Sequence, residues 1–188
     1  MNHFSCAFYA CIMSFIFATG SLVAPRTSYA KVDPPNYDFS LDRLEPFMPG
    51  KSLKESLKKQ TEVEVIRKEK GYEVRKIYIE HIRYKFPLLI QSKDGVITDF
   101  YARLPAYFLH NIFHQSLINR LGDQDIYKKL EEQAVYAWKN KKGNNHVYSG
   151  ACTITCFPVY YTVFKVEKAP KGFVPLVKIM SAQESGTL

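Results

Sequence analysis

Two histidines, His110 and His114, have the spacing in this chain that most favours chemistry. They are four residues apart in a segment that we expect to be helical, so both imidazoles project from one helix face, as a two-histidine zinc clamp requires. Both also fall within the apolar arc of that helix, where a buried imidazole needs a hydrogen-bond partner. We therefore favour core histidines bonded to backbone or tyrosine hydroxyls. The zinc alternative needs a third ligand from Asp123, Asp125, Glu131 or His146.

Cys152 and Cys156 are the second pair, since the other two cysteines, Cys6 and Cys11, lie within the first thirty residues. An even pair in an oxidising compartment predicts a disulfide. Positions i and i+4 of a straight strand are about 13 Å apart at about 3.3 Å per residue, whereas a disulfide needs α-carbons within about 7 Å. The disulfide therefore requires a sharp bend through residues 153–155. The alternative is a free thiol activated by a histidine as nucleophile and base.

Aromatic residues are abundant, with 13 Tyr, 13 Phe and a single Trp. Aromatic side chains on an open sheet face can stack on sugar rings or anchor a protein partner. The alternative is that they fill the core between sheet and helix. The predicted binding surface consists of Tyr136, Trp138, Tyr148, Tyr160 and Tyr161.

The first thirty residues carry no Asp, Glu or Lys, and their apolar run covers roughly residues 4–23. The run is followed by Ser28 and Ala30, small residues at the two positions that a signal peptidase reads. This pattern predicts a signal peptide over residues 1–30 and export to the periplasm or the extracellular space. The alternative is an uncleaved membrane anchor, because the apolar run approaches the length of a spanning helix.

The net charge is +8, and residues 51–93 hold twelve basic and six acidic residues. A basic segment of an exported protein would attract an anionic envelope surface or an acidic envelope protein. We expect no nucleic-acid partner outside the cytoplasm, and only peripheral membrane contact unless the leader stays uncleaved. The alternative is a solvated strand face that keeps the protein soluble.

The first half of the chain predicts a meander. Residues 31–50 contain four prolines, which indicates an extended lead. A short helix should follow, with Ser52 as N-cap and Glu55 at capping-box spacing. Period-two alternation, with turns at Lys70-Gly71 and Asp94-Gly95, then predicts an antiparallel meander. Its four strands are 61–68, 72–86, 86–91 and 96–102.

The second half should supply the main helix, from Pro105 to Leu121, with Gly122 as its C-terminal cap. Residues 126–132 are expected to add a helical turn. Further strands are expected at 133–140, 146–166 and 173–180, before a frayed tail at 183–188.

A helix ending in Leu121-Gly122, a short Asp-containing link, the strand motif Tyr136-Ala137-Trp138 and a hairpin follow one another over about 113–166. This order resembles the small exported domains of the outer-membrane assembly lipoprotein and β-lactamase-inhibitor type. The resemblance implies a binding role.

The sequence therefore predicts one α+β domain over residues 51–182, with an antiparallel sheet of about six or seven strands and one main helix (about 105–121) packed on one face. The predicted function is that of a small exported binding or envelope-interaction protein without catalytic activity or cofactor. Two alternatives stay open. One is a hydrolase that uses zinc or a Cys/His pair with His110 and His114, and the other is a protein inhibitor acting through the loop 150–156.

Overall fold

The computed structural model describes residues 41–81, 84–106, 108–165 and 173–184. The predicted signal peptide, the first part of the lead and the end of the tail lie outside these residues. Among the described residues, no helix has both the length and the apolar character needed to cross a membrane.

The described chain forms one antiparallel sheet of eight strands with four helical segments. The strands follow the spatial order β1-β2-β3-β4-β8-β7-β6-β5. They are β1 (Val63–Glu69), β2 (Tyr72–His81), β3 (Tyr84–Lys93), β4 (Val96–Arg103), β5 (Ile126–Leu130), β6 (Gln133–Lys141), β7 (Asn144–Cys152) and β8 (Cys156–Lys165). The helices are η2 (Leu41–Phe47), α1 (Leu53–Ser56), α2 (His110–Leu121) and α3 (Leu176–Glu184). An antiparallel sheet with helices matches the predicted class, but the strands number eight rather than six or seven.

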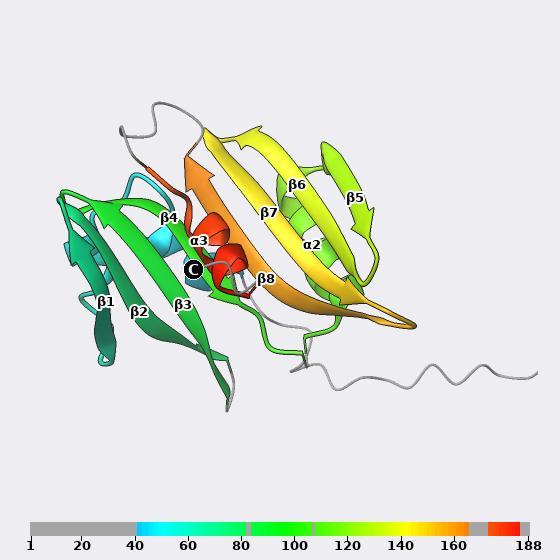
Figure 1. Ribbon diagram of the computed structural model, residues 1–188, viewed down its shortest axis with the longest axis horizontal. Coiled ribbons are helices and arrows are strands. Elements are labelled where there is room, and N and C mark those ends of the chain that lie inside the picture. The colour runs from blue at the N-terminus through cyan, green and yellow to red at the C-terminus, as the bar shows by residue number, and fades with distance from the viewer. Residues whose placement is uncertain (1–40, 82–83, 107, 166–172, 185–188) are drawn as a thin grey trace, which may run out of the picture. The chain divides into compact units, whose positions relative to one another are not determined.

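The sheet consists of two four-stranded meanders, β1–β4 and β5–β8, joined edge to edge by β4 and β8 (Figure 1). Five residue pairs, from Asp99↔Phe164 to Arg103↔Tyr160, form this junction. The predicted turns at Lys70-Gly71 and Asp94-Gly95 are present, and all four residues have positive φ. Two-residue turns of this kind match the twist of the flanking strands. Because these turn residues are recognisable in the sequence, the first meander could be predicted.

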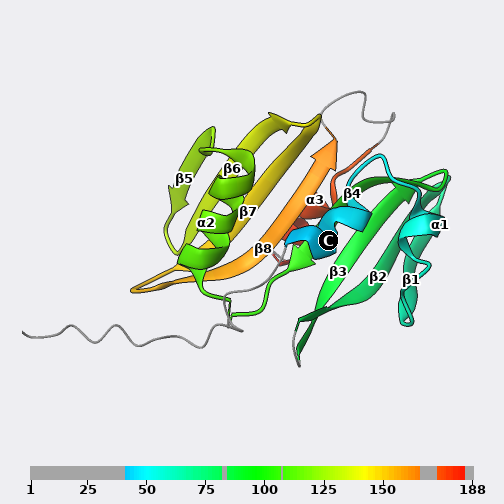
Figure 2. The same cartoon turned by 180° about the vertical axis from the view of Figure 1, so that it is seen from behind.

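The two faces of the sheet are covered differently. η2, α1 and α2 lie on one face, here called the front face, which is turned towards the viewer in Figure 2. α3 lies on the other, the back face, which is turned towards the viewer in Figure 1. The large core is on the front face, where Phe113 and Leu117 of α2 pack against strand residues such as Trp138 and Tyr148. The back face holds a smaller cluster around Leu176 of α3.

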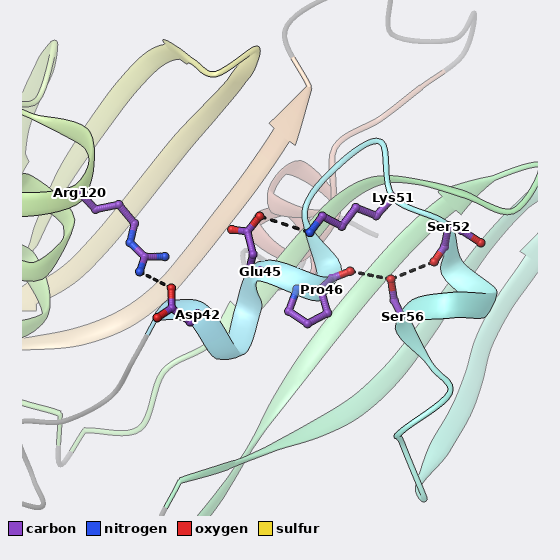
Figure 3. A network of polar contacts seen from close by, with 7 residues as sticks. All are labelled: Asp42, Glu45, Pro46, Lys51, Ser52, Ser56 and Arg120. Carbon is purple, nitrogen blue, oxygen red and sulfur yellow. Dashed lines mark hydrogen bonds and ion pairs between the residues drawn. The ribbon is translucent and has the colours of Figure 1, made fainter.

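The prediction of an extended lead is wrong for residues 41–47, which form the 3₁₀ helix η2. With three residues per turn, its apolar side chains at Leu41, Leu44 and Phe47 share one stripe, and all three are buried in the front-face core. An ion pair between Asp42 and Arg120 ties η2 to α2 (Figure 3).

The segment after η2 is held by polar contacts rather than by the predicted capping box. Ser52 precedes α1 but its side chain makes no capping bond. Instead the Ser56 hydroxyl shares its one proton between the Pro46 carbonyl at 2.5 Å and the Ser52 carbonyl at 2.9 Å, and Lys51 pairs with Glu45 at 3.3 Å (Figure 3).

Three predicted elements differ from the structure. The main helix begins at His110 rather than at residue 105. Residues 126–130 are the strand β5 rather than a helical turn, because pairing with β6 satisfies their backbone groups. Residues 173–180 were expected to be a strand, but α3 begins directly after Pro175, and proline is well suited to the residues that open a helix.

Candidate functional site

His110, the first residue of α2, is buried between two tyrosines of the sheet. Its Nδ1 lies 2.9 Å from the Tyr148 hydroxyl and its Nε2 lies 3.4 Å from the Tyr136 hydroxyl. Tyr136 and Tyr148 are directly paired across β6 and β7, so both hydroxyls reach the same imidazole. A neutral imidazole has one N–H donor and one acceptor nitrogen, so one tyrosine donates to His110 and the other accepts. Burial, helped by the neighbouring His114, lowers the His110 pKa and favours this neutral form.

His114 lies one helical turn further on and stacks within the same cluster. Its ring centroid is 4.1 Å from that of Tyr136 and 5.6 Å from that of His110. Burial lowers its pKa, and the nearby Gln124 side chain opposes part of that shift. Yet the His114 Nε2 and the Gln124 Oε1 are both buried without a hydrogen bond of normal geometry in the described part of the chain.

The structure brings the two predicted zinc donors together but adds no third. Within residues 41–81, 84–106, 108–165 and 173–184, no group of three His, Cys, Asp or Glu side chains is placed to hold a metal ion. Of the candidate third ligands, Asp125 accepts from the Lys139 amide at 2.6 Å. His146 is buried, and its Nδ1 lies 2.7 Å from the Tyr161 hydroxyl. These residues therefore have other partners.

Cys152 ends β7 and Cys156 begins β8, and the two are opposite each other in the ladder. Their α-carbons are 4.0 Å apart and their sulfurs form a disulfide, so the chain bends between them as predicted. In this oxidised form neither sulfur is a thiolate, which removes the nucleophile that a Cys/His hydrolase would use. At the tip of the closed loop the Ile154 side chain is fully exposed.

The predicted aromatic binding surface is wrong for four of its five residues. Trp138, Tyr148 and Tyr161 are at most 2% exposed and Tyr136 is 9% exposed, because all four point to the front face under α2. Their hydroxyls and indole N–H find partners inside the core; Trp138, for example, donates to the Gly122 carbonyl at 2.7 Å. Only Tyr160 points to the back face, where it packs beside α3.

The back face of β5–β8 carries the exposed apolar side chains that sequence reasoning missed. Directly paired residues in a ladder share a face, and residues next to the buried aromatics point the other way. On this basis the back face of β5–β8 includes Ile126, Lys128, Leu130, Gln133, Val135, Ala137, Val147, Ser149, Ala151, Phe157, Tyr160 and Thr162. Ile126, Leu130 and Phe157 are 40%, 43% and 46% exposed. Alternation with the core positions is the signal that could have found them.

Five of the basic residues in the first meander are paired with carboxylates, although basic residues still outnumber acidic ones there. These cations pair with acidic neighbours in the same meander or in the residues just before it. The pairs are Arg67–Glu69, Arg75–Glu73, Lys76–Glu64, Lys85–Glu62 and Lys93–Asp94. This meander is therefore a less open cationic surface than the sequence suggested.

Comparison of the chain with protein-family models, with curated proteins and with solved structures finds no match in any of the three.

Proposed function

We propose that this protein is an exported, non-catalytic binding protein that docks a protein partner of the cell envelope on the back face of β5–β8. The observation that carries the proposal is the partial exposure of Ile126, Leu130 and Phe157 on one continuous sheet face. Exposed apolar side chains gathered on one face commonly mark an interaction site, and here Lys128 and Gln133 lie among them.

The chemistry of this face also supports a protein partner. Small residues such as Ala137, opposite Ile126, and Ala151, opposite Phe157, lie beside the exposed side chains and are half-buried. They leave a shallow surface on which apolar side chains of a partner could rest. Lys128 and, at the end of β4, Arg103 are exposed beside it. None of the back-face residues named above is acidic, so a partner with carboxylates around an apolar centre fits best.

Export is supported by the disulfide, because disulfides persist mainly in oxidising compartments. The test is the intact mass and thiol content of the exported chain without reductant. Cleavage after Ala30 predicts a mature chain that begins at Lys31 with no free thiol. An N-terminus upstream of residue 30 on a membrane-bound product would favour the anchor instead.

The binding surface is tested by substitution. Phe157→Glu and Leu130→Glu each place a carboxylate on the apolar face and should weaken binding of the envelope partner at least about tenfold. The control is Val65→Glu, which changes a side chain 53% exposed on β1 in the other meander. Binding would be measured with the purified partner, after cross-linking in the envelope of the source cell identifies it. Equal loss in all three variants would contradict the proposal.

Anionic vesicles distinguish the second predicted partner, an anionic envelope surface. If vesicles rich in phosphatidylglycerol bind the wild type and Phe157→Glu equally in a flotation assay, charge rather than the apolar face carries the interaction. That result would replace the protein partner by a lipid surface.

One observation favours the inhibitor alternative. Ile154 is fully exposed on a loop that a disulfide closes, and such a rigid tip is preorganised for insertion into a cleft. If the partner proves to be an enzyme, its inhibition should be relieved by Ile154→Asp. Inhibition that survives this change but is lost in Phe157→Glu would assign the contact to the sheet face.

The hydrolase alternative needs a metal, a thiolate or a third ligand at the histidines. Its test is the zinc content of untagged protein purified without chelator, compared with that of His114→Ala. Stoichiometric zinc that is lost in the variant would overturn the non-catalytic proposal and direct the search to hydrolysis.

A further inference from the structure

The described sheet ends in two edge strands, β1 and β5, and they are protected to different degrees. A free edge presents backbone N–H and C=O groups to any other strand. The pairing of β1 with β2 shifts register between Val65 and Arg67, and its charged side chains have both signs. Charged side chains protect an edge, and β5 has them too in Lys128 and Lys129, but of the two edge strands only β1 has a bulge, which also protects an edge. β5 pairs with β6 in unbroken register along all five of its residues.

β5 also carries exposed apolar side chains on both of its faces. Ile126 and Leu130 on the back face are 40% and 43% exposed, and Tyr127 on the front face is 55% exposed. Its cations are the adjacent Lys128 and Lys129, both exposed. A strand added beside β5 would therefore continue the hydrogen-bonded ladder and cover apolar side chains above and below it.

We propose that this strand is β5 of a second copy, paired antiparallel about a two-fold axis at Tyr127. In an antiparallel ladder, directly opposed residues have side chains on the same face of the sheet. In a two-fold symmetric pair one residue must therefore lie opposite its own copy, and the axis runs between these two copies. An axis at Lys128 or Lys129 would set like charges opposite each other, which is destabilising. An axis at Ile126 or Leu130 would move half of the pairing off the strand, into the preceding link or the β5–β6 turn.

The axis at Tyr127 gives favourable cross-strand pairs instead. Tyr127 faces Tyr127 of the second copy, and aromatic pairs stabilise a sheet. Ile126 faces Lys128, so no two lysines are opposed. Lys129 faces Asp125, whose backbone already runs beside β6, since its amide donates to the Ala137 carbonyl at 2.9 Å. The Asp125 Oδ2 accepts from the Lys139 amide, so Lys129 of the second copy would pair with Oδ1, which gives two symmetric opposite-charge pairs.

Two properties of the dimer follow. Five residues per strand bury a small area, so the association is weak and depends on concentration. The net charge of the exported chain, +8 for the full sequence less Arg26 of the leader, opposes it, so added salt strengthens it by screening the repulsion. The proposal goes beyond the binding function, because pairing at β5 would set the back faces of two copies side by side in one continuous sheet.

Sedimentation equilibrium of the exported chain tests the proposal. We expect a monomer–dimer equilibrium that shifts towards dimer from low to moderate salt. Lys129→Glu sets like charges opposite Asp125 twice and should raise the dissociation constant about tenfold. The matched control is Lys128→Glu, which makes the same change of charge on the next residue but faces Ile126, and should dimerise at least as well as the wild type.

A second measurement reads the register directly. Directly opposed positions bring α-carbons to about 4.5 to 5.5 Å, within disulfide range. Tyr127→Cys should therefore form a covalent dimer on mild oxidation, whereas Lys129→Cys should not. A chain that stays monomeric at millimolar concentration, or cross-linking by Lys129→Cys but not by Tyr127→Cys, would overturn the proposal. A strand of another protein bound at β5 in place of the second copy would overturn it as well.

Discussion

The α-carbon of Gly150 lies so close to the His110 ring that a β-carbon added there would be 3.1 Å from Nδ1. The same atom would be 3.0 Å from the Phe157 carbonyl oxygen, which belongs to the backbone and cannot move freely. The absence of a side chain at residue 150 therefore sets where the first turn of α2 rests on β7.

Replacing Gly150 by Ala should lower the free energy of unfolding by about 1 to 3 kcal/mol, because one methyl group overpacks a closed site. Denaturant unfolding measures the change. The same substitution in a His110→Ala background should cost less, since the ring it strikes is gone. An identical cost in both backgrounds would assign the strain to the Phe157 carbonyl alone.

Trp138 should behave as a buried residue. It is 0% exposed and its indole donates to the Gly122 carbonyl, so we expect blue-shifted fluorescence and weak quenching by iodide. Trp138→Phe removes this donor and part of the ring, and should cost about 2 to 4 kcal/mol. Tyr127→Phe, at a half-exposed aromatic, serves as the control and should cost little. Emission typical of water-exposed tryptophan would contradict the packing of α2 on the sheet.

His146 should make the protein less stable in mild acid. Burial lowers its pKa from 6.5 to about 4, so the unfolded chain takes up a proton first as the pH falls. Stability from this residue is full above pH 6.5 and is lost between pH 6.5 and 4, at about 1.4 kcal/mol per pH unit. Between pH 7 and 5, His146→Gln should lose about 2 kcal/mol less than the wild type. Parallel pH profiles of the two proteins would disprove a neutral, buried imidazole.

Asp99 acts in the opposite direction. Burial raises its pKa from 3.8 to about 6, although it accepts hydrogen bonds from the Leu176 amide at 2.7 Å, from Thr98 and from Gln91. As the pH falls from 6 towards 3.8, the folded state binds a proton that the unfolded chain does not, so Asp99 adds stability. Asp99→Asn removes this gain. As the pH falls, the free energy of unfolding of the variant should therefore decrease more steeply than that of the wild type. The comparison uses denaturant unfolding at pH 7, 5 and 4.

The strands of the first meander could be predicted because their signals are local. Alternation of side chains and the turn at Asp94-Gly95 depend on neighbours along the chain. The bend between Cys152 and Cys156 was predictable for a similar reason, since only a turn brings the two sulfurs together.

The predictions were wrong where contacts between residues far apart in the sequence determine the structure. β5 is a strand because β6 lies beside it, and α3 is helical although its valine and isoleucine favour strands, because Leu176 packs on the back face. For the aromatics of β6 and β7 the sequence left both a surface role and a core role open. Their face is fixed by α2, whose docking no local pattern reports, and the exposed positions Ile126 and Phe157 follow only once that face is known.

The single junction between β4 and β8 has a consequence for the order of folding. Every other strand pair is a hairpin between consecutive strands, whereas the β4–β8 pairs join residues 57 to 65 positions apart. Pairing between distant residues costs more chain entropy and is slower to form. Each meander should therefore take shape while the junction is still open, and the closing of this one junction should limit the folding rate. Until the junction closes, β4 of one molecule can pair with β8 of another. Refolding at high protein concentration should therefore yield domain-swapped dimers.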